Sequence, residues 1–135
     1  MNFYSGFLDS NYTRRKETFL NAHAAERDSL LALKKAGYEI DAWLSKKYPA
    51  EANALRPPLS LLLDHIDYIV KLIGVKGVGL GSDFDGIESA PQELDDVTAY
   101  PLITKGLLQR GYSKRDVKKI LGGNFLRVLK ANNPK

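Results

Sequence analysis

Cysteine is absent from the sequence, which excludes disulfide bonds, cysteine-ligated zinc, iron–sulfur clusters and a thiol nucleophile. Histidine is scarce, because His23 and His65 are the only two. Neither has a second histidine or an acidic partner at a ligand spacing such as H-E-x-x-H. We therefore interpret both as structural or solvated residues, and we expect the chain itself to contribute no metal ligand.

Long apolar stretches are also missing. No run approaches the roughly 20 apolar residues that cross a bilayer, and the first seven residues lack the basic region and long apolar core of a signal peptide. Neither sign of charge is in large excess, since 20 Lys and Arg face 16 Asp and Glu, for a net charge of +4. This excess only weakly favours acidic partners. We expect a soluble chain without a membrane span, in the cytoplasm or in a compartment that the sequence leaves unknown.

The residues that are present predict one globular unit, residues 1–135. Hydrophobic residues make up 44% of the sequence and charged residues 27%, which is ordinary for a folded domain. No internal repeat, low-complexity tract or long flexible linker divides the chain. Helix-forming residues and helix terminators predict helices at about residues 14–35, 39–48, 59–73, 101–111, 113–121 and 125–131.

Glycine and capping residues set the expected helix ends. Gly37 is expected to stop the first helix and Gly74 the third, in which apolar residues recur at three- and four-residue spacing. Ser113, three residues before Asp116, resembles an acidic form of the capping box. Asn124 is expected to cap the last helix, after a break at two glycines.

Between the third and fourth predicted helices, glycines alternate with Val78, Leu80 and Ser82. This period of two predicts a strand at about residues 77–82. Glycine at alternate positions indicates that side-chain volume is excluded on one face of a crowded sheet or barrel. A single strand needs partner strands for its backbone groups. We therefore expect the chain to be an incomplete part of an α/β fold.

Asp83 follows directly after this strand. Parallel α/β folds place catalytic groups at the carboxyl ends of their strands, so Asp83 is the candidate catalytic residue. The turn formed by residues 84–86 is expected to leave its side chain facing the mouth of the sheet rather than the core. The alternative is that Asp83 and Asp85 only cap turns and the next helix. The spacing alone does not decide between the two interpretations.

Five blocks of the sequence resemble the membrane (renal) dipeptidase family and occur in that family's order. The most specific block is Gly79–Ile87, GLGSDFDGI, which resembles the segment spanning the family's eighth barrel strand. Residues 2–4, NFY, resemble the end of its seventh strand, and residues 64–69 resemble the helix that follows. The remaining similar residues are Pro91, Leu94, Asp96-Val97, Tyr100-Pro101-Leu102, Arg110–Ser113 and Gly122–Val128. Residues 14–54 carry no motif of the family.

The resemblance implies a (β/α)8 TIM-type barrel, of which residues 1–135 are the C-terminal fragment, mostly helical with one complete strand at about 77–82. It also implies a zinc-dependent dipeptidase, in which histidines and acidic residues hold two zinc ions. Asp83 matches the family's eighth-strand aspartate, which takes a proton from the attacking water and delivers it to the leaving amine. Because the zinc ligands lie on earlier strands, we expect the isolated chain to be inactive. The resemblance implies a dipeptide substrate, and the sequence allows a homo-oligomer.

Two other functions fit parts of the sequence. A nucleic-acid-binding or helical interaction module would use the basic residues of the last two helices, Lys114, Arg115, Lys118, Lys119, Arg127 and Lys130. Packing of these helices on a sheet explains the same segment, so we expect no nucleic acid partner. The strand running into Asp83 is also similar to the nucleophile motif of haloacid-dehalogenase-like phosphotransferases. Ile87 argues against that family, which usually has threonine at this position.

Overall fold

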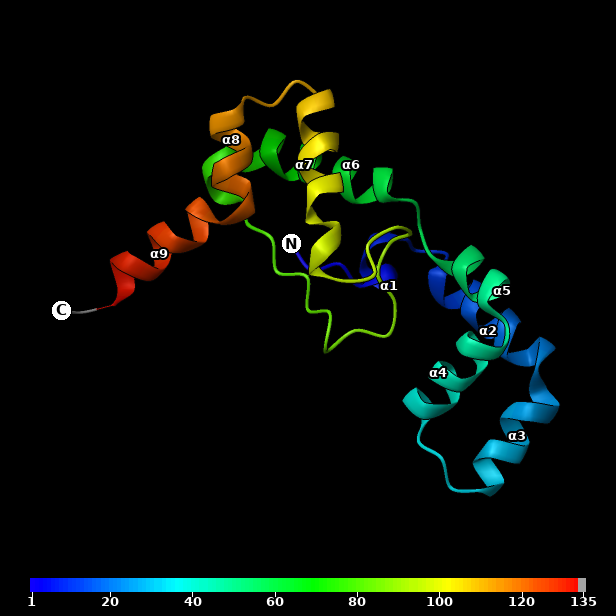
Figure 1. The fold of residues 1–135 in the computed structure, drawn as a ribbon. Coiled ribbons are helices and arrows are strands. Elements are labelled where there is room, and N and C mark those ends of the chain that lie inside the picture. Colours follow the sequence, from blue (N-terminus) through cyan, green and yellow to red (C-terminus); the bar gives the residue numbers. More distant parts are fainter. Residues whose placement is uncertain (134–135) are drawn as a thin grey trace.

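Helices dominate the computed structural model, which describes residues 1–133 (Figure 1). The helices are α1 (Ser5–Leu8), α2 (Tyr12–Ala22), α3 (Ala24–Ala32), α4 (Gly37–Lys47), α5 (Pro49–Leu55), α6 (Leu59–Ile73), α7 (Tyr100–Gln109), α8 (Lys114–Lys118) and α9 (Asn124–Asn132). Short 3-10 turns span Val75–Gly77 and Val97–Ala99, and Lys119–Gly123, a π-helical segment kinked at Gly122 (φ 178°, ψ −23°), joins α8 to α9.

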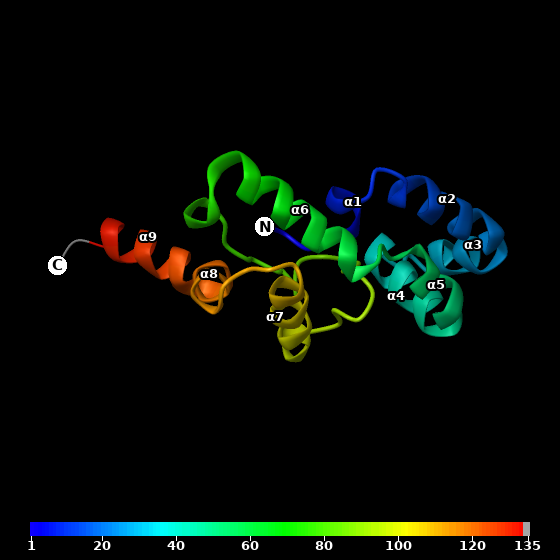
Figure 2. The same ribbon diagram turned by 90° about the horizontal axis from the view of Figure 1, so that it is seen from above.

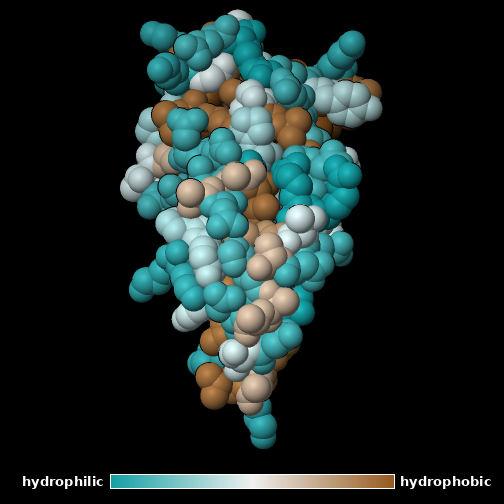
Figure 3. All heavy atoms as spheres, turned by 90° about the vertical axis from the view of Figure 1, so that its right-hand side faces the viewer, coloured by the Kyte–Doolittle hydropathy of each residue, from teal (hydrophilic) through white to brown (hydrophobic). Residues whose placement is uncertain are grey.

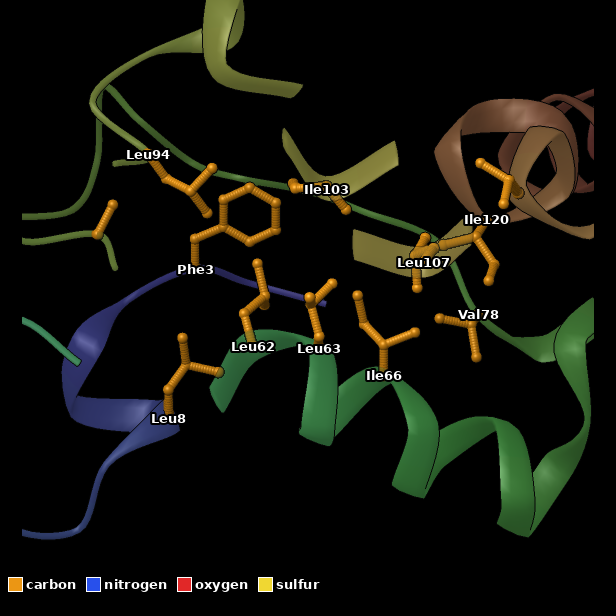
Figure 4. Close-up of a cluster of buried hydrophobic side chains, with 12 residues drawn as sticks. Phe3, Leu8, Leu62, Leu63, Ile66, Val78, Leu94, Ile103, Leu107 and Ile120 are labelled. Carbon is orange, nitrogen blue, oxygen red and sulfur yellow. The ribbon is translucent and has the colours of Figure 1, made fainter. Parts of the chain in front are cut away.

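The main core lies between α6, α7 and the segments that carry Phe3 and Val78 (Figure 4). Helix α6 has the predicted bounds, and it buries one face through Leu62, Leu63 and Ile66. Gly74 ends it with a φ of 76°, a conformation that favours glycine. The aromatic ring of Phe3 is fully buried among side chains from both helices, as Figure 4 shows. The first residues of the chain are therefore fixed by the core.

A second, smaller core holds helices α2 to α5 together as a separate lobe, at the right of Figure 1. Phe19 and Leu44 form its centre together with Ile40. This lobe covers nearly all of the segment in which no family motif was found, residues 14–54. Its own apolar contacts explain why the segment folds as a compact group of helices.

The expected single helix over residues 14–35 is wrong, because the structure breaks it into α2 and α3 at His23, with φ −111° and ψ 33°. The imidazole of His23 stacks on the Tyr48 ring, with 3.8 Å between the ring centroids, and its Nε2 lies 3.0 Å from the Glu51 carboxylate. These contacts with α5 and its N-terminal cap turn the chain. Gly37 also begins α4 instead of stopping a helix, since Lys34 reverses the chain with a φ of 58°.

The strand expected at residues 77–82 is wrong as well, since residues 1–133 contain no assigned strand. Val78 has extended dihedrals, φ −107° and ψ 133°, but residues 75–77 form a 3-10 turn. Within residues 1–133, only the backbone of Met1 pairs with the backbone of residues 78–82: its amino group donates to the Gly79 carbonyl at 2.7 Å, and the Gly81 N–H donates to the Met1 carbonyl at 3.0 Å. Those two bonds are the pattern of a parallel pair at one position. The segment is extended but lacks neighbours along its length, so it does not form a ladder.

The C-terminal helices have some, but not all, of the predicted start and capping residues. Pro101 lies in the first turn of α7, and the Ser113 hydroxyl accepts a hydrogen bond from the Asp116 N–H at 3.1 Å, as the capping box predicts. Asn124 does not cap α9, so that prediction is wrong. Its buried side-chain amide donates to the carbonyls of Val75 and Val78, both at 2.7 Å. The amide thus ties the start of α9 to the segment leading to Asp83.

Many large apolar side chains are exposed. Figures 1 and 2 show that α9 projects away from the other helices, and its Phe125 is 64% exposed. Tyr68, Leu72 and Ile73 leave an apolar surface on the outer side of α6. Hydrophobic residues also show between hydrophilic ones over the helical lobe, near the turn between α3 and α4 (Figure 3). Within residues 1–133, no helix combines the length and apolar character needed to cross a membrane.

We expect the isolated chain to self-associate or to unfold with low cooperativity, because covering its exposed apolar faces would lower the free energy of the system. Light scattering over a dilution series, with thermal unfolding followed by circular dichroism, measures both properties. A compact monomer that is stable on dilution and melts sharply would contradict this expectation.

Candidate functional site

Asp83 lies where the extended segment ends, and its side chain is exposed, as the sequence analysis expected. Its backbone has a φ of 63°, and the Gly86 N–H donates to its carbonyl at 2.9 Å, closing a turn over residues 83–86. A non-glycine residue in this left-handed region is uncommon and occurs where surrounding contacts hold it. The turn therefore directs the carboxylate outward from a defined backbone.

Along this turn, exposed residues alternate with a half-buried one. Phe84 is half-buried and packs edge-on against Phe3, with 5.9 Å between the ring centroids. Asp85 is exposed like Asp83. Phe84 thus anchors the turn to the main core while both carboxylates face solvent. Asp83 differs from Asp85 in lining a hollow of about 310 Å³, whose other walls are Asn2, Tyr4, Phe7, Gly86, Ile87 and Glu88.

Asn2 brings the start of the chain to Asp83. Its side-chain Nδ2 donates to Asp83 Oδ2 at 3.1 Å, and its Oδ1 accepts from the Tyr4 N–H at 2.7 Å. From the sequence, Asn2 was expected only as part of the NFY block, without a contact with Asp83. The hydrogen bond joins residues 81 positions apart, so no local sequence signal predicts it.

The helical lobe holds the loop that follows Asp83. Lys16 bridges the lobe and the loop, since its Nζ lies 2.6 Å from the carboxylates of both Asp41 and Glu88. Burial alone would lower the pKa of Lys16, but its hydrogen bonds to these two carboxylates raise the pKa above its ordinary value. The lysine therefore stays protonated and keeps both contacts.

Two further residues, Arg56 and Ser5, fasten the same loop. Arg56 donates to the carbonyls of Ala90 and Pro91, at 2.8 and 2.6 Å, and the Ser5 N–H donates to the Ser89 carbonyl at 2.8 Å. A cavity of about 340 Å³ lies between lobe and loop, with Phe19 and Leu55 on one side and Phe84 and Leu94 on the other. Sequence reasoning missed Lys16 and Arg56, whose partners lie far away along the chain.

The two histidines lie apart and make structural contacts. His65 Nε2 lies 2.9 Å from the Leu8 carbonyl, and His23 is the residue that stacks on Tyr48. No three His, Cys, Asp or Glu side chains within residues 1–133 come together as a metal-binding group. A catalytic zinc site needs about three protein ligands around an open position. The described residues therefore do not fit a zinc site by themselves.

Part of the basic cluster on the last helices is engaged within the chain. Lys119 Nζ lies 2.6 Å from the Asp116 carboxylate, and Arg127 Nη2 donates to the Lys76 carbonyl at 2.9 Å. The first contact joins the segment Lys119–Gly123 to α8, and the second joins α9 to the turn Val75–Gly77.

Comparisons with known proteins confirm the family resemblance. A family model described as membrane dipeptidase (peptidase family M19) matches residues 1–134. The chain is 42% identical over 102 residues to dipeptidase aclJ of Aspergillus oryzae, covering 76% of this chain and 24% of that protein. It is 42% identical over 88 residues to dipeptidase tcpJ of Claviceps purpurea, covering 65% and 20%. It is 37% identical over 103 residues to dipeptidase 3 of Homo sapiens, covering 76% and 21%.

The chain spans about a quarter or less of the length of these relatives. The family model nevertheless matches nearly every residue that the chain has. The protein therefore belongs to the membrane dipeptidase family, peptidase family M19.

Proposed function

We propose that this chain supplies one part of the active site of a zinc-dependent dipeptidase and that Asp83 is its proton-transferring residue. The observation that carries the proposal is the position of Asp83, an exposed carboxylate on a fixed turn beside a hollow. Family membership supports dipeptides as the substrates, since the similar proteins named above are dipeptidases.

The chemistry of peptide hydrolysis explains the role of a carboxylate at this position. The attacking water must lose a proton, and the leaving amine must gain one. In the proposal, Asp83 accepts the first proton and later donates it to the amine nitrogen. Zinc, when bound in the complete active site, polarises water so that hydroxide is available near neutral pH. The ligands for zinc would come from residues outside those described here.

In this proposal, residues 1–133 are the last part of a (β/α)8 barrel, and residues 2–4 and about 77–82 take the places of its last two strands only when the preceding strands are present. The two parallel-type hydrogen bonds between Met1 and the glycines at 79 and 81 support this arrangement. Asn2 and Asp83 then lie at the carboxyl ends of neighbouring strands, where such barrels place their active sites.

We expect the isolated chain neither to hold a pair of zinc ions nor to hydrolyse dipeptides. Its two histidines lie apart, and the exposed carboxylates of Asp83 and Asp85 can bind a cation only loosely, which neither fixes two metals nor positions a hydroxide. Equilibrium dialysis with excess zinc and an assay with several dipeptides measure both expectations. An Asp83→Asn variant of the isolated chain is assayed beside it.

Hydrolysis by the isolated chain that disappears in Asp83→Asn would show that these residues form a complete enzyme, and the proposed division of the active site would be wrong. The second half of the experiment uses a longer dipeptidase that contains these residues together with the preceding barrel strands. That protein is expected to bind zinc and to hydrolyse dipeptides. Its failure to act on any dipeptide would refute the proposed function.

A further inference from the structure

The side chain of Asn2 is held in one orientation. Its Oδ1 accepts a hydrogen bond from the Tyr4 N–H at 2.7 Å, and an NH2 group in that position would set a donor against a donor. The Nδ2 must therefore point the other way, toward Asp83 Oδ2, which lies 3.1 Å from it. The orientation of this amide follows from its hydrogen bonds alone.

The backbone that carries Asn2 is also fixed. Met1, on one side of Asn2, pairs with Gly79 and Gly81 through two hydrogen bonds. Phe3, on the other side, is fully buried in the main core. The donor thus lies on a rigid segment. A hydrogen bond from a rigid donor restricts the rotation of the carboxylate that accepts it.

Gly86 leaves space for the same carboxylate. A Cβ atom at position 86 would collide with the Oδ1 of Asp83, so only glycine leaves room for the carboxylate in its present position. Within residues 1–133, Asn2 is the only hydrogen-bond donor to the Asp83 carboxylate. One oxygen is therefore held by an amide, and the other has no partner among the described residues.

We infer that Asn2 is a positioning residue for Asp83: its amide holds Oδ2 so that Oδ1 is aimed to exchange the proton. The inference rests on the proposed function of Asp83. Asn2 itself does not take part in proton transfer, because a side-chain amide neither gains nor loses a proton near neutral pH. It acts on the rate by fixing the direction from which Asp83 meets the water and the leaving amine.

Asn2→Asp removes the hydrogen bond from Asn2 to Asp83 and keeps the one from the Tyr4 N–H. The new carboxylate keeps an oxygen that accepts from the Tyr4 N–H, so the local turn is retained. It has no donor for Asp83 and repels the neighbouring carboxylate. If Asn2 only fixes the local turn, the rate lost in Asn2→Asp comes from the added charge, and Asn2→Ser, which is uncharged and keeps an oxygen for the Tyr4 N–H but is too short to reach Asp83, retains the full rate. A positioning role predicts that both variants lose rate.

The test measures kcat and KM for a dipeptide in a longer dipeptidase that contains these residues and the zinc ligands. For Asn2→Asp we expect kcat to fall by roughly 100-fold, the order of loss that follows a small misplacement of a catalytic group, with KM little changed. Asn11→Asp is the matched control, since it makes the same chemical change at an exposed position where the Oδ1 of Asn11 accepts from Arg14. Its kcat is expected to equal that of the unaltered enzyme.

A second measurement does not depend on activity. In the 15N-labelled 135-residue chain, Asp83→Ala is expected to shift the side-chain amide proton signals of Asn2, because their acceptor is removed. Unchanged signals, or a kcat for Asn2→Asp equal to that of the control, would overturn the inference. If instead Asp83→Asn remains fully active in the longer enzyme, the proposed function of Asp83 fails, whatever Asn2 does.

Discussion

Asp83→Asn in a longer dipeptidase is expected to lower kcat by about 10²- to 10⁴-fold, the range that positioned general acid–base groups contribute. The substitution keeps the size of the side chain and an oxygen that accepts from Asn2. It removes the ability to take a proton from water and to return it to the amine. Zinc content is expected to stay nearly unchanged, because the proposal assigns the zinc ligands to other residues. Steady-state kinetics and metal analysis of the same preparations measure both quantities.

Asp85→Asn is the matched control for this prediction. Asp85 lies two residues further along the same turn and is exposed like Asp83, but it does not line the hollow beside Asn2. Its substitution makes the same change of charge and is expected to leave kcat within a few-fold of the unaltered enzyme. Equal losses in the two variants would mean that the charge of the turn matters, and not a specific role of Asp83.

Where local signals agree with tertiary packing, the sequence predicts the structure well. The apolar period of α6 and the glycine after it give both ends of that helix correctly. The Ser113 cap and the place of Pro101 in α7 are also correct. Each of these features depends on residues within four positions of one another, and their physical causes are local.

The errors arise where distant residues decide the conformation. The helix break at His23 comes with stacking on Tyr48, which lies 25 positions later in the sequence. The extended segment before Asp83 has the alternation of a strand, but a strand also needs neighbours, and Met1 is the one residue in the described chain whose backbone pairs with it. Propensity describes a residue and its near neighbours, so it cannot supply those partners.

The same distinction between local signals and distant contacts applies to the candidate site. The strand-end position and the resemblance both indicated Asp83, and the structure places its side chain at the surface. Asn2, Lys16 and Arg56 lie far from their partners along the chain and were not recognised as contacts of the site. The NFY block, which the resemblance assigned to the end of a neighbouring strand, contains Asn2, and the Asn2 side chain contacts Asp83.

Asn124→Ala is expected to lower the free energy of unfolding by about 2–6 kcal/mol, since it leaves two carbonyl acceptors without their donor at about 1–3 kcal/mol each. Asn124 is 6% exposed, and its amide donates to Val75 and Val78, just before the segment that ends at Asp83. The better helix propensity of alanine offsets only a few tenths of a kcal/mol. The loss should therefore loosen the contact between α9 and the backbone that positions Asp83.

Asn132→Ala provides the comparison, because the amide of Asn132 also donates to a backbone carbonyl, that of Val128, but at an exposed position. Water replaces such a bond, so this variant should change stability by no more than about 0.5 kcal/mol. Urea unfolding followed by circular dichroism, at concentrations where light scattering shows monomer, measures both variants. A shared small effect would mean that the Asn124 amide does not stabilise the fold. A large effect at Asn124 alone would show that this amide joins the C-terminal helices to the segment carrying the catalytic candidate.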